Sequence, residues 1–283
     1  MITNLIINIL GVFLIVWLVQ YFFAKKKFPK QNMKYLKKEN ILGERFVINR
    51  DGKENIDTNY YRYDNQKKTG LIVVCHGGSL MNGDVDLTDS FCDELRNECE
   101  CAVVSINYTK LPNQKPPYQQ QEIIDAVMFF MNHCEEFNLI EGNIVFVGFT
   151  GGSYLQIGAG CLLNDFGIQI KGLVSFYPLL DDSIIKLTDM NYIKYPLAVV
   201  SANNQIENQR IDTWCEHLSN ANVDYDKKEY PDAMMGFIEY QFDEYMNNPM
   251  FRRNLKGYDE DQKLMSHACM MWVENQVKQY LEQ

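Results

Sequence analysis

Residues 148–152, Gly-Phe-Thr-Gly-Gly, have the spacing Gly-x-Ser-x-Gly, in which a strand turns sharply into a helix and presents a nucleophilic hydroxyl group. Thr150 occupies the central position, where the motif has serine. Such a turn holds its central residue at strained backbone angles, which a β-branched side chain tolerates poorly. Gly148 and Gly152 suit the turn because a side chain at either position would collide with neighbouring backbone. The stretch therefore fits the geometry of such a turn better than it fits nucleophilic catalysis.

Three further motifs accompany this turn in a fixed order. They are His76-Gly77-Gly78 after a buried strand, a Tyr-x-x-x-Pro turn from Tyr108 to Pro112, and Tyr177-Pro178 after a later strand. Together the four motifs resemble those of the hormone-sensitive-lipase-like group of α/β-hydrolases, over about residues 44–283. The resemblance implies the α/β-hydrolase fold and the site of a carboxylesterase or lipase.

The resemblance also implies a catalytic triad in the chain order Ser, acid, His, and all three places are changed here. Thr150 holds the place of the nucleophile, Gln205 that of the acid, and Met235 that of the histidine before Gly-Phe. Methionine cannot accept a proton from a hydroxyl group at neutral pH, so the general base is missing. The sequence therefore predicts a catalytically degenerate site, a pseudoenzyme.

No other side chain is expected to supply the missing base. His76 belongs to the Gly-rich turn, and the other three histidines are expected in helices away from the turn at Thr150. Ser153 is expected one helical turn further on, facing away from it. The remaining histidines are His133, His217 and His267.

The resemblance further implies an oxyanion hole, formed by the backbone N–H groups of Gly77 or Gly78 with that of Gly151. These groups could still bind a small acyl or carboxylate ligand. We therefore interpret the chain as a protein that acts by binding. Two alternatives stay open: a weak or unconventional carboxylic ester hydrolase that uses Thr150, and a scaffold without a ligand. No cofactor and no metal site is predicted.

Residues 1–24 are almost entirely apolar, and about 20 such residues cross a bilayer as a helix. Lys25, Lys26 and Lys27 follow directly, and seven lysines lie between Lys25 and Lys38. We predict a single-pass membrane anchor at 1–24 and a juxtamembrane linker at 25–43. By the positive-inside rule the following domain faces the cytoplasm, and the linker lysines could contact anionic lipid.

The composition excludes one class of partner and sets the expected compartment. The 283 residues carry a formal charge of −10, which argues against a nucleic-acid-binding face. The eight cysteines lie mostly in apolar patterns, which predicts buried or partly buried free thiols in a reducing compartment.

Residues 44–283 alternate strand and helix patterns, which predicts a mostly parallel central sheet flanked by helices. The first two strands are expected to be antiparallel, and the last is expected to be exposed or at an edge. The short segment between Pro178 and Tyr195 leaves no room for a cap, and residues 238–262 form an insertion that covers the old active site or meets a partner. Strands are expected at 44–49, 59–63, 70–75, 101–106, 144–147, 172–176, 197–201 and 224–230, and helices at 88–97, 119–137, 211–219 and 263–281.

Overall fold

The computed structural model describes residues 38–64, 67–180, 192–248, 251 and 255–283. Residues Lys38–Gln283 form one compact unit. The predicted anchor at residues 1–24 lies outside the described part of the chain. Within that part, no helix combines the length and apolar character needed to cross a membrane.

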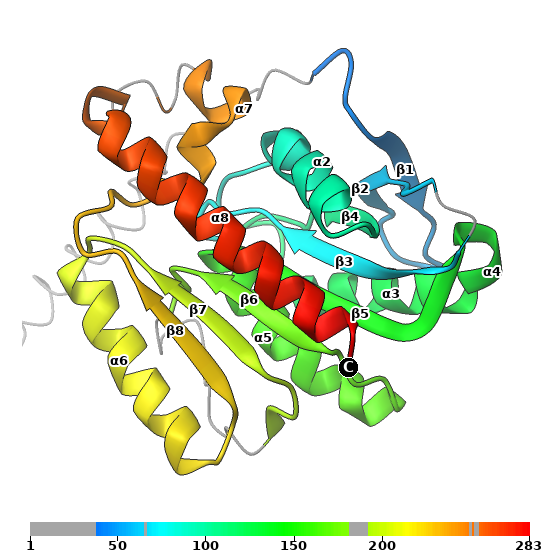
Figure 1. Cartoon of the computed structure of the whole chain (residues 1–283). Helices are drawn as coiled ribbons and strands as arrows, with labels where there is room; N and C mark the ends of the chain where they lie inside the picture. The colour runs from blue at the N-terminus through cyan, green and yellow to red at the C-terminus, as the bar shows by residue number, and fades with distance from the viewer. Residues whose placement is uncertain (1–37, 65–66, 181–191, 249–250, 252–254) are drawn as a thin grey trace, which may run out of the picture. The chain divides into compact units, whose positions relative to one another are not determined.

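A central eight-stranded sheet organises the domain (Figure 1). Its strand order is β1-β2-β4-β3-β5-β6-β7-β8. The pairs β1–β2 and β2–β4 are antiparallel, and every later neighbouring pair is parallel, which confirms the predicted mostly parallel sheet. The strands are β1 (Glu44–Ile48), β2 (Ile56–Tyr61), β3 (Thr69–Cys75), β4 (Ala102–Ile106), β5 (Leu139–Phe149), β6 (Gly172–Phe176), β7 (Leu197–Ser201) and β8 (Tyr225–Glu229).

Helices cover both faces of this sheet. The helices are α2 (Asp89–Glu98), α3 (Tyr118–Asn132), α4 (Cys134–Phe137), α5 (Gly151–Leu163), α6 (Gln205–Asn220), α7 (Asp243–Met246) and α8 (Glu260–Leu281). Short 3₁₀ helices lie at η1 (Val85–Thr88), η2 (Asn164–Phe166), η4 (Glu239–Gln241) and η5 (Leu255–Gly257).

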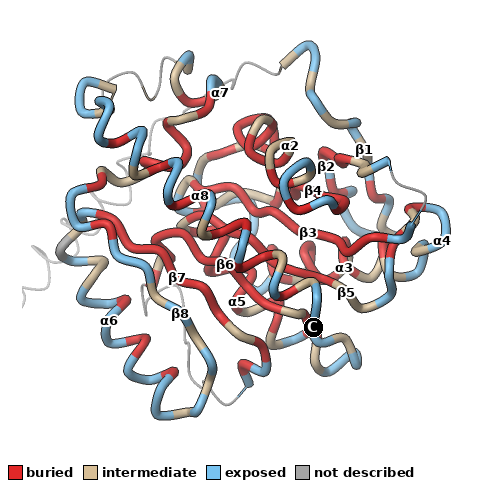
Figure 2. Tube along the Cα trace, in the orientation of Figure 1, coloured by how far each residue is buried: buried red, intermediate tan, exposed pale blue. Residues whose placement is uncertain are grey.

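Alternation along the strands sorts the core into two layers. In β3, Leu71 and Val73 face one apolar cluster with α3, α5 and α6, whereas Ile72 and Val74 face a second cluster with α2 and α8. All seven residues of β3 are buried, as expected for a strand covered on both sides (Figure 2). This continuous burial explains why the sequence of the central strands is an unbroken apolar run.

Several predicted elements differ from the structure at their ends, and three of them differ most. The helix expected at 119–137 is divided into α3 and α4 at His133, whose backbone leaves the helical region at φ −120° and ψ 28°. The helix expected at 211–219 already begins at Gln205, because the Asn204 side chain caps it by accepting a hydrogen bond from the Glu207 N–H. Strand β5 begins five residues before the predicted strand, at Leu139.

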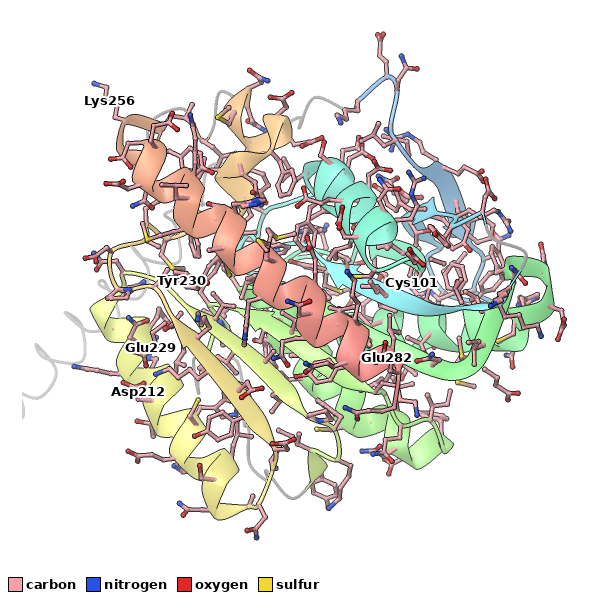
Figure 3. All side chains as sticks on the ribbon, in the orientation of Figure 1. Cys101, Asp212, Glu229, Tyr230, Lys256 and Glu282 are labelled. Carbon is pink, nitrogen blue, oxygen red and sulfur yellow. The ribbon has the colours of Figure 1, made fainter. Side chains whose placement is uncertain are left out.

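Strand β8 is the edge strand that the sequence predicts. Its Lys227 ammonium group forms ion pairs with Asp212 of α6 and Glu229, two carboxylates that Figure 3 places on neighbouring elements. Charged side chains on an edge strand discourage pairing with a further strand. All eight cysteines are free and are buried or partly buried, among them Cys101 directly before β4, as predicted from the apolar patterns around them.

The beginning of the described chain is bound to the domain by charge. Lys38 Nζ lies 2.7 Å from Asp89 of α2 and 2.5 Å from Glu244 of α7. Arg45 of β1 makes a bidentate contact with Asp86, at 2.8 and 2.9 Å. Lys38, the last lysine of the predicted linker cluster, therefore contacts the domain surface, next to the helix α7 that borders the candidate site.

Candidate functional site

Thr150 occupies the tip of a strand-to-helix turn between β5 and α5. Its backbone angles are φ 45° and ψ −111°, a sparsely populated region for a residue with a Cβ, which costs about 1–3 kcal/mol. Backbone hydrogen bonds hold it there: its N–H donates to Phe176 O at 2.9 Å, and its carbonyl accepts from Tyr154 N and Leu179 N. The strained turn predicted from the sequence is confirmed, with threonine in it.

Close backbone contacts require glycine on both sides of Thr150. A Cβ on Gly148 would lie 2.5 Å from Ser153 Cα, and a Cβ on Gly152 would lie 2.4 Å from the carbonyl oxygen of Cys75. A real Cβ atom essentially never lies this close to an atom to which it is not bonded, so any side chain here would displace β3 or α5. The turn is therefore built as tightly as an active nucleophile would need.

The Gly-rich turn after β3 lies directly beside Thr150. The Gly78 N–H donates to Thr150 Oγ1 at 3.3 Å, and a Cβ on Gly77 would lie 3.1 Å from the same oxygen. Thus one N–H of the predicted oxyanion hole binds the threonine hydroxyl in this structure. Gly151, the third residue of that prediction, begins α5, and its Cα faces Leu80.

His76 orders this turn and does not face Thr150. It is fully buried, stacks on the Tyr108 ring with centroids 4.4 Å apart, and donates from Nδ1 to the Gly77 carbonyl at 2.7 Å. Burial, and then the charge of Lys110, hold its pKa well below the ordinary value of 6.5, so the ring is neutral. The interpretation of His76 as a structural residue is confirmed by these contacts.

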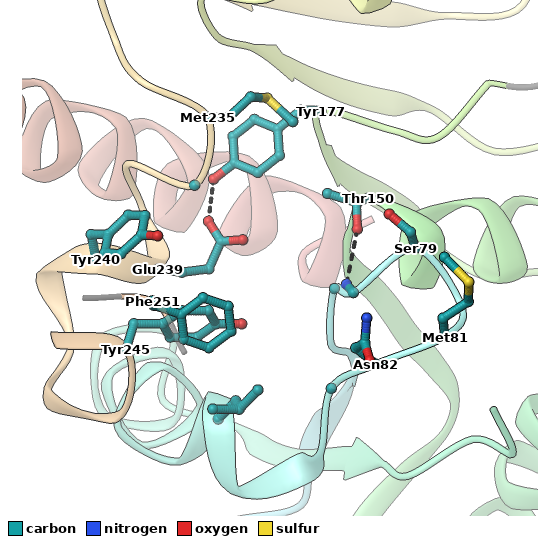
Figure 4. Close-up of a pocket in the computed structure, with 15 residues that line it drawn as sticks. Ser79, Met81, Asn82, Thr150, Tyr177, Met235, Glu239, Tyr240, Tyr245 and Phe251 are labelled. Atoms are coloured by element: carbon teal, nitrogen blue, oxygen red, sulfur yellow. Dashed lines mark hydrogen bonds between the residues drawn. The ribbon is translucent and has the colours of Figure 1, made fainter. Parts of the chain in front are cut away.

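A cavity of about 330 Å³ opens beside Thr150 (Figure 4). In this view Thr150, Ser79 and Asn82 border it on one side, and Tyr240, Tyr245 and Phe251 on the other. Its volume is at the lower end of the range for small-molecule sites. The described residues that line it are Gly77, Gly78, Ser79, Met81, Asn82, Gly83, Leu87, Thr150, Tyr177, Met235, Gly236, Glu239, Tyr240, Tyr245 and Phe251.

Met235 lines the same cavity as Thr150, as its predicted place in the triad requires. The loop that carries it is clamped by Gln262 of α8. Gln262 Oε1 accepts from Met234 N at 2.8 Å, and its Nε2 donates to Asp232 O at 2.8 Å. The thioether side chain is therefore held at the cavity by a defined loop, although it offers no proton acceptor for Thr150.

Gln205, predicted at the place of the acid, is the first residue of α6, directly after the Asn204 cap. Its backbone follows the carboxyl end of β7, the strand next to β6. The position of its side chain lies outside what the structure describes. The other two predicted triad positions, Thr150 and Met235, both line the cavity.

Glu239 is the one carboxylic acid among the described residues that line the cavity, and the sequence did not predict it. Its side chain is 7% exposed and accepts a hydrogen bond from the Tyr177 hydroxyl group, shown as a dashed line in Figure 4. Burial raises the pKa of Glu239 to about 7, although the Tyr177 hydrogen bond lowers it. Within the described chain, no cation pairs with this carboxyl group. A titratable group near neutral pH thus borders the cavity.

The segment predicted as an insertion supplies the aromatic wall. Tyr240 and Tyr245 are almost fully buried, and their rings lie 6.1 Å apart at 69°. Phe251 lies 4.7 Å from the Tyr245 ring. The expectation that residues 238–262 cover the old active site is met by these residues, although the individual positions were not predicted. In the sequence, the one sign of an acidic group at this wall was the single glutamate in the otherwise apolar and aromatic stretch Phe-Ile-Glu-Tyr.

The remaining candidates lie elsewhere. His133, His217 and His267 are exposed, and none of them lines the cavity. Ser153 is fully buried and hydrogen-bonded to Ser175, so it faces away from the cavity as predicted. The segment expected to lack a cap falls largely on residues 181–191, which lie outside the described residues.

A family model described as "alpha/beta hydrolase fold" matches residues 72–228, more than half of the chain. The chain belongs to this α/β-hydrolase family. The match confirms the resemblance to the hormone-sensitive-lipase-like group, and it includes the Gly-rich turn, the Thr150 turn and β7. It ends before Met235 and the aromatic wall.

Relatives of this α/β-hydrolase include named esterases. An arylesterase of Saccharolobus solfataricus is 26% identical over 111 residues, which cover 39% of this chain and 36% of that protein. A putative α/β hydrolase of Acanthamoeba polyphaga mimivirus is 26% identical over 117 residues, covering 41% of this chain and 34% of the relative. Each match therefore spans about a third of the relative's length.

Among solved structures, the metagenomic thermostable carboxylesterase EstE1 superposes with a TM-score of 0.69. It is 14% identical, and the alignment covers 86% of this chain and 90% of the carboxylesterase. At this identity the likeness establishes the fold alone. The fold of this α/β-hydrolase is thus shared along nearly its whole length with an ester hydrolase, and its site has to be judged by its own residues.

Proposed function

We propose that this protein is a catalytically degenerate member of the carboxylesterase- and lipase-like α/β-hydrolases, and that it binds a small ligand in the cavity beside Thr150 without turning it over. The observation that carries the proposal is Met235, which faces the cavity where this family places its histidine. None of the four histidines of the chain lines that cavity. An intact strand-to-helix turn at Thr150 without an imidazole base suits the binding of a ligand better than its hydrolysis.

The alternative function is a weak ester hydrolase that uses Thr150, and two observations favour it. The family contains esterases, and Glu239 lines the same cavity with a pKa of about 7, a suitable value for a general base. Against it, the carboxyl group of Glu239 is hydrogen-bonded to Tyr177, and the hydroxyl group of Thr150 accepts a hydrogen bond from Gly78. The scaffold alternative leaves the cavity without a role.

The purified full-length chain should hydrolyse p-nitrophenyl acetate no faster than buffer, and a fluorophosphonate probe should leave it unlabelled. An active esterase of this family, assayed in parallel, validates both reagents. The wild type is compared with Thr150→Ala and Glu239→Gln. Turnover that either substitution abolishes would establish the hydrolase and overturn the binding proposal.

We further propose that residues 1–24 anchor the chain in a membrane, with Lys25, Lys26 and Lys27 at anionic head groups on the cytoplasmic side. Support comes from the apolar run followed directly by lysines, and from the free thiols of the domain. Protease added to intact cells should leave the domain whole, whereas the same protease should digest it after permeabilisation. Digestion in intact cells would show that the domain lies outside and would overturn the proposed topology.

A further inference from the structure

The wall of the cavity is aromatic on more than one side. The Tyr240 ring stands at 69° to the Tyr245 ring and at 86° to the Phe251 ring, with centroids 6.1 and 6.4 Å apart. Tyr177 adds a fourth aromatic side chain to the lining. The faces of aromatic rings carry partial negative charge, and rings set at large angles can surround a small group.

Among the described residues that line this cavity, the charged side chains have one sign. Glu239 is the single carboxylic acid of this described lining, which contains no lysine, arginine or histidine. The chain as a whole carries a formal charge of −10. A low-dielectric cavity with a carboxyl group and several ring faces attracts a cation and disfavours an anion.

The Glu239 carboxyl group has hydrogen-bond donors but no cation beside it among the described residues. One of its oxygens accepts from the Tyr177 hydroxyl group, and no ion pair to it forms within the described chain. A buried carboxyl group without a cation is costly, which raises its pKa to about 7. A ligand that brought a positive charge to this wall would stabilise the ionised form.

We propose that the cavity binds a small ligand with an alkylammonium or quaternary ammonium group, whose cation lies against Glu239 and the rings of Tyr240, Tyr245 and Phe251. The proposal rests on the binding function proposed above and names its ligand class. The neutral end of the ligand would extend toward Thr150 and Ser79, which border the opposite side of the cavity in Figure 4. A volume of about 330 Å³ accommodates a small molecule of this kind and not a folded partner.

Two probes of nearly the same shape test the charge requirement. Choline carries a trimethylammonium group, and 3,3-dimethylbutan-1-ol is its neutral carbon isostere. We expect isothermal titration of the full-length chain, in a non-ionic detergent, to show choline bound at least about tenfold more tightly than the isostere. Equal binding of the two probes would overturn the ammonium proposal while leaving a binding function in place.

Two substitutions locate the cation. Glu239→Gln keeps the shape of the side chain and its ability to accept from Tyr177, and it should reduce the preference for choline to about threefold or less. Phe251→Leu, at a half-buried position, should weaken choline binding more than isostere binding. Glu136→Gln, the same chemical change at an exposed site on α4, is the matched control and should change neither affinity.

Two further results would overturn the ammonium proposal. A choline preference that survives Glu239→Gln would place the cation elsewhere and overturn the proposal. Absence of heat with both probes would also overturn it. In that case the ester assay decides the proposed function independently, because Thr150-dependent turnover would exclude a binding-only protein and background rates would not.

Discussion

Replacing Glu239 by Gln should raise the free energy of unfolding by about 3 kcal/mol at pH 8 and leave it nearly unchanged at pH 4. The ordinary glutamate pKa of 4.5 applies to the unfolded chain, whereas burial raises the pKa in the folded chain to about 7. Between these values the folded state holds a proton that the unfolded state has released. Wild-type stability therefore falls as the pH rises through this window and is constant above it.

The size of the effect follows from the width of that window. The window spans about 2.5 pH units, and each unit corresponds to about 1.36 kcal/mol. The glutamine side chain does not ionise in this pH range, and its amide oxygen can still accept a hydrogen bond from the Tyr177 hydroxyl group. Urea denaturation of the wild type and of Glu239→Gln at pH 4, 6 and 8 measures the difference between their unfolding free energies. The contributions of other titrating groups, such as Glu274, are the same in both proteins and cancel in this difference.

Glu136→Gln serves as the control, because Glu136 is exposed on α4 and its replacement should change the unfolding free energy little at any pH. A Glu239→Gln difference that stays constant from pH 4 to pH 8 would contradict the burial of an ionisable carboxyl group at the cavity. A confirmed difference would show that the protein keeps Glu239 at a cost in stability. Such costs are typical of residues retained for function.

The sequence predicted the parts of the fold that local patterns determine. Strands β3, β6 and β7 are short and mostly apolar, so their positions followed from the local hydrophobic pattern. The turn at Thr150 followed from the spacing of Gly148 and Gly152, whose contacts leave no room for a side chain. These features depend on residues close together in the chain.

Other boundaries depend on contacts that a periodic pattern does not reveal. Phe130 and Phe137 lie on the two sides of the break at His133, and both are buried in the same cluster. Their spacing of seven therefore looked like one continuous helical face. The early start of β5 includes Gly142 at φ 73° and polar neighbours, which resembled a turn.

The cavity wall could not be predicted residue by residue. Glu239, Tyr240 and Tyr245 lie on a 3₁₀ helix and on a four-residue helix, which are too short to show a hydrophobic period. Their burial arises from tertiary contacts: Glu239 is hydrogen-bonded to Tyr177, and α7 packs against η1 and α2. The chain pattern indicated an unusual segment, and only the folded arrangement shows that its acid faces the site.

The triple variant Thr150→Ser, Gln205→Asp, Met235→His should hydrolyse p-nitrophenyl acetate at least about tenfold faster than the wild type. Serine removes the β-branch at φ 45°, and histidine at 235 places an imidazole on the cavity that Thr150 already borders. General-base catalysis contributes about 10²–10⁴-fold. Positioning errors of about 1 Å can cost 10²-fold, so we expect a partial recovery.

The double variant Thr150→Ser, Gln205→Asp is the control, because it keeps Met235 and therefore lacks a proton acceptor at that position. It should stay at the wild-type rate, and the fluorophosphonate probe should label the triple variant alone. Activity in the double variant would point to another base, with Glu239 the first candidate because it lines the same cavity. A folded triple variant without activity would mean that the turn at Thr150 has been kept while the geometry around Met235 has diverged from catalysis.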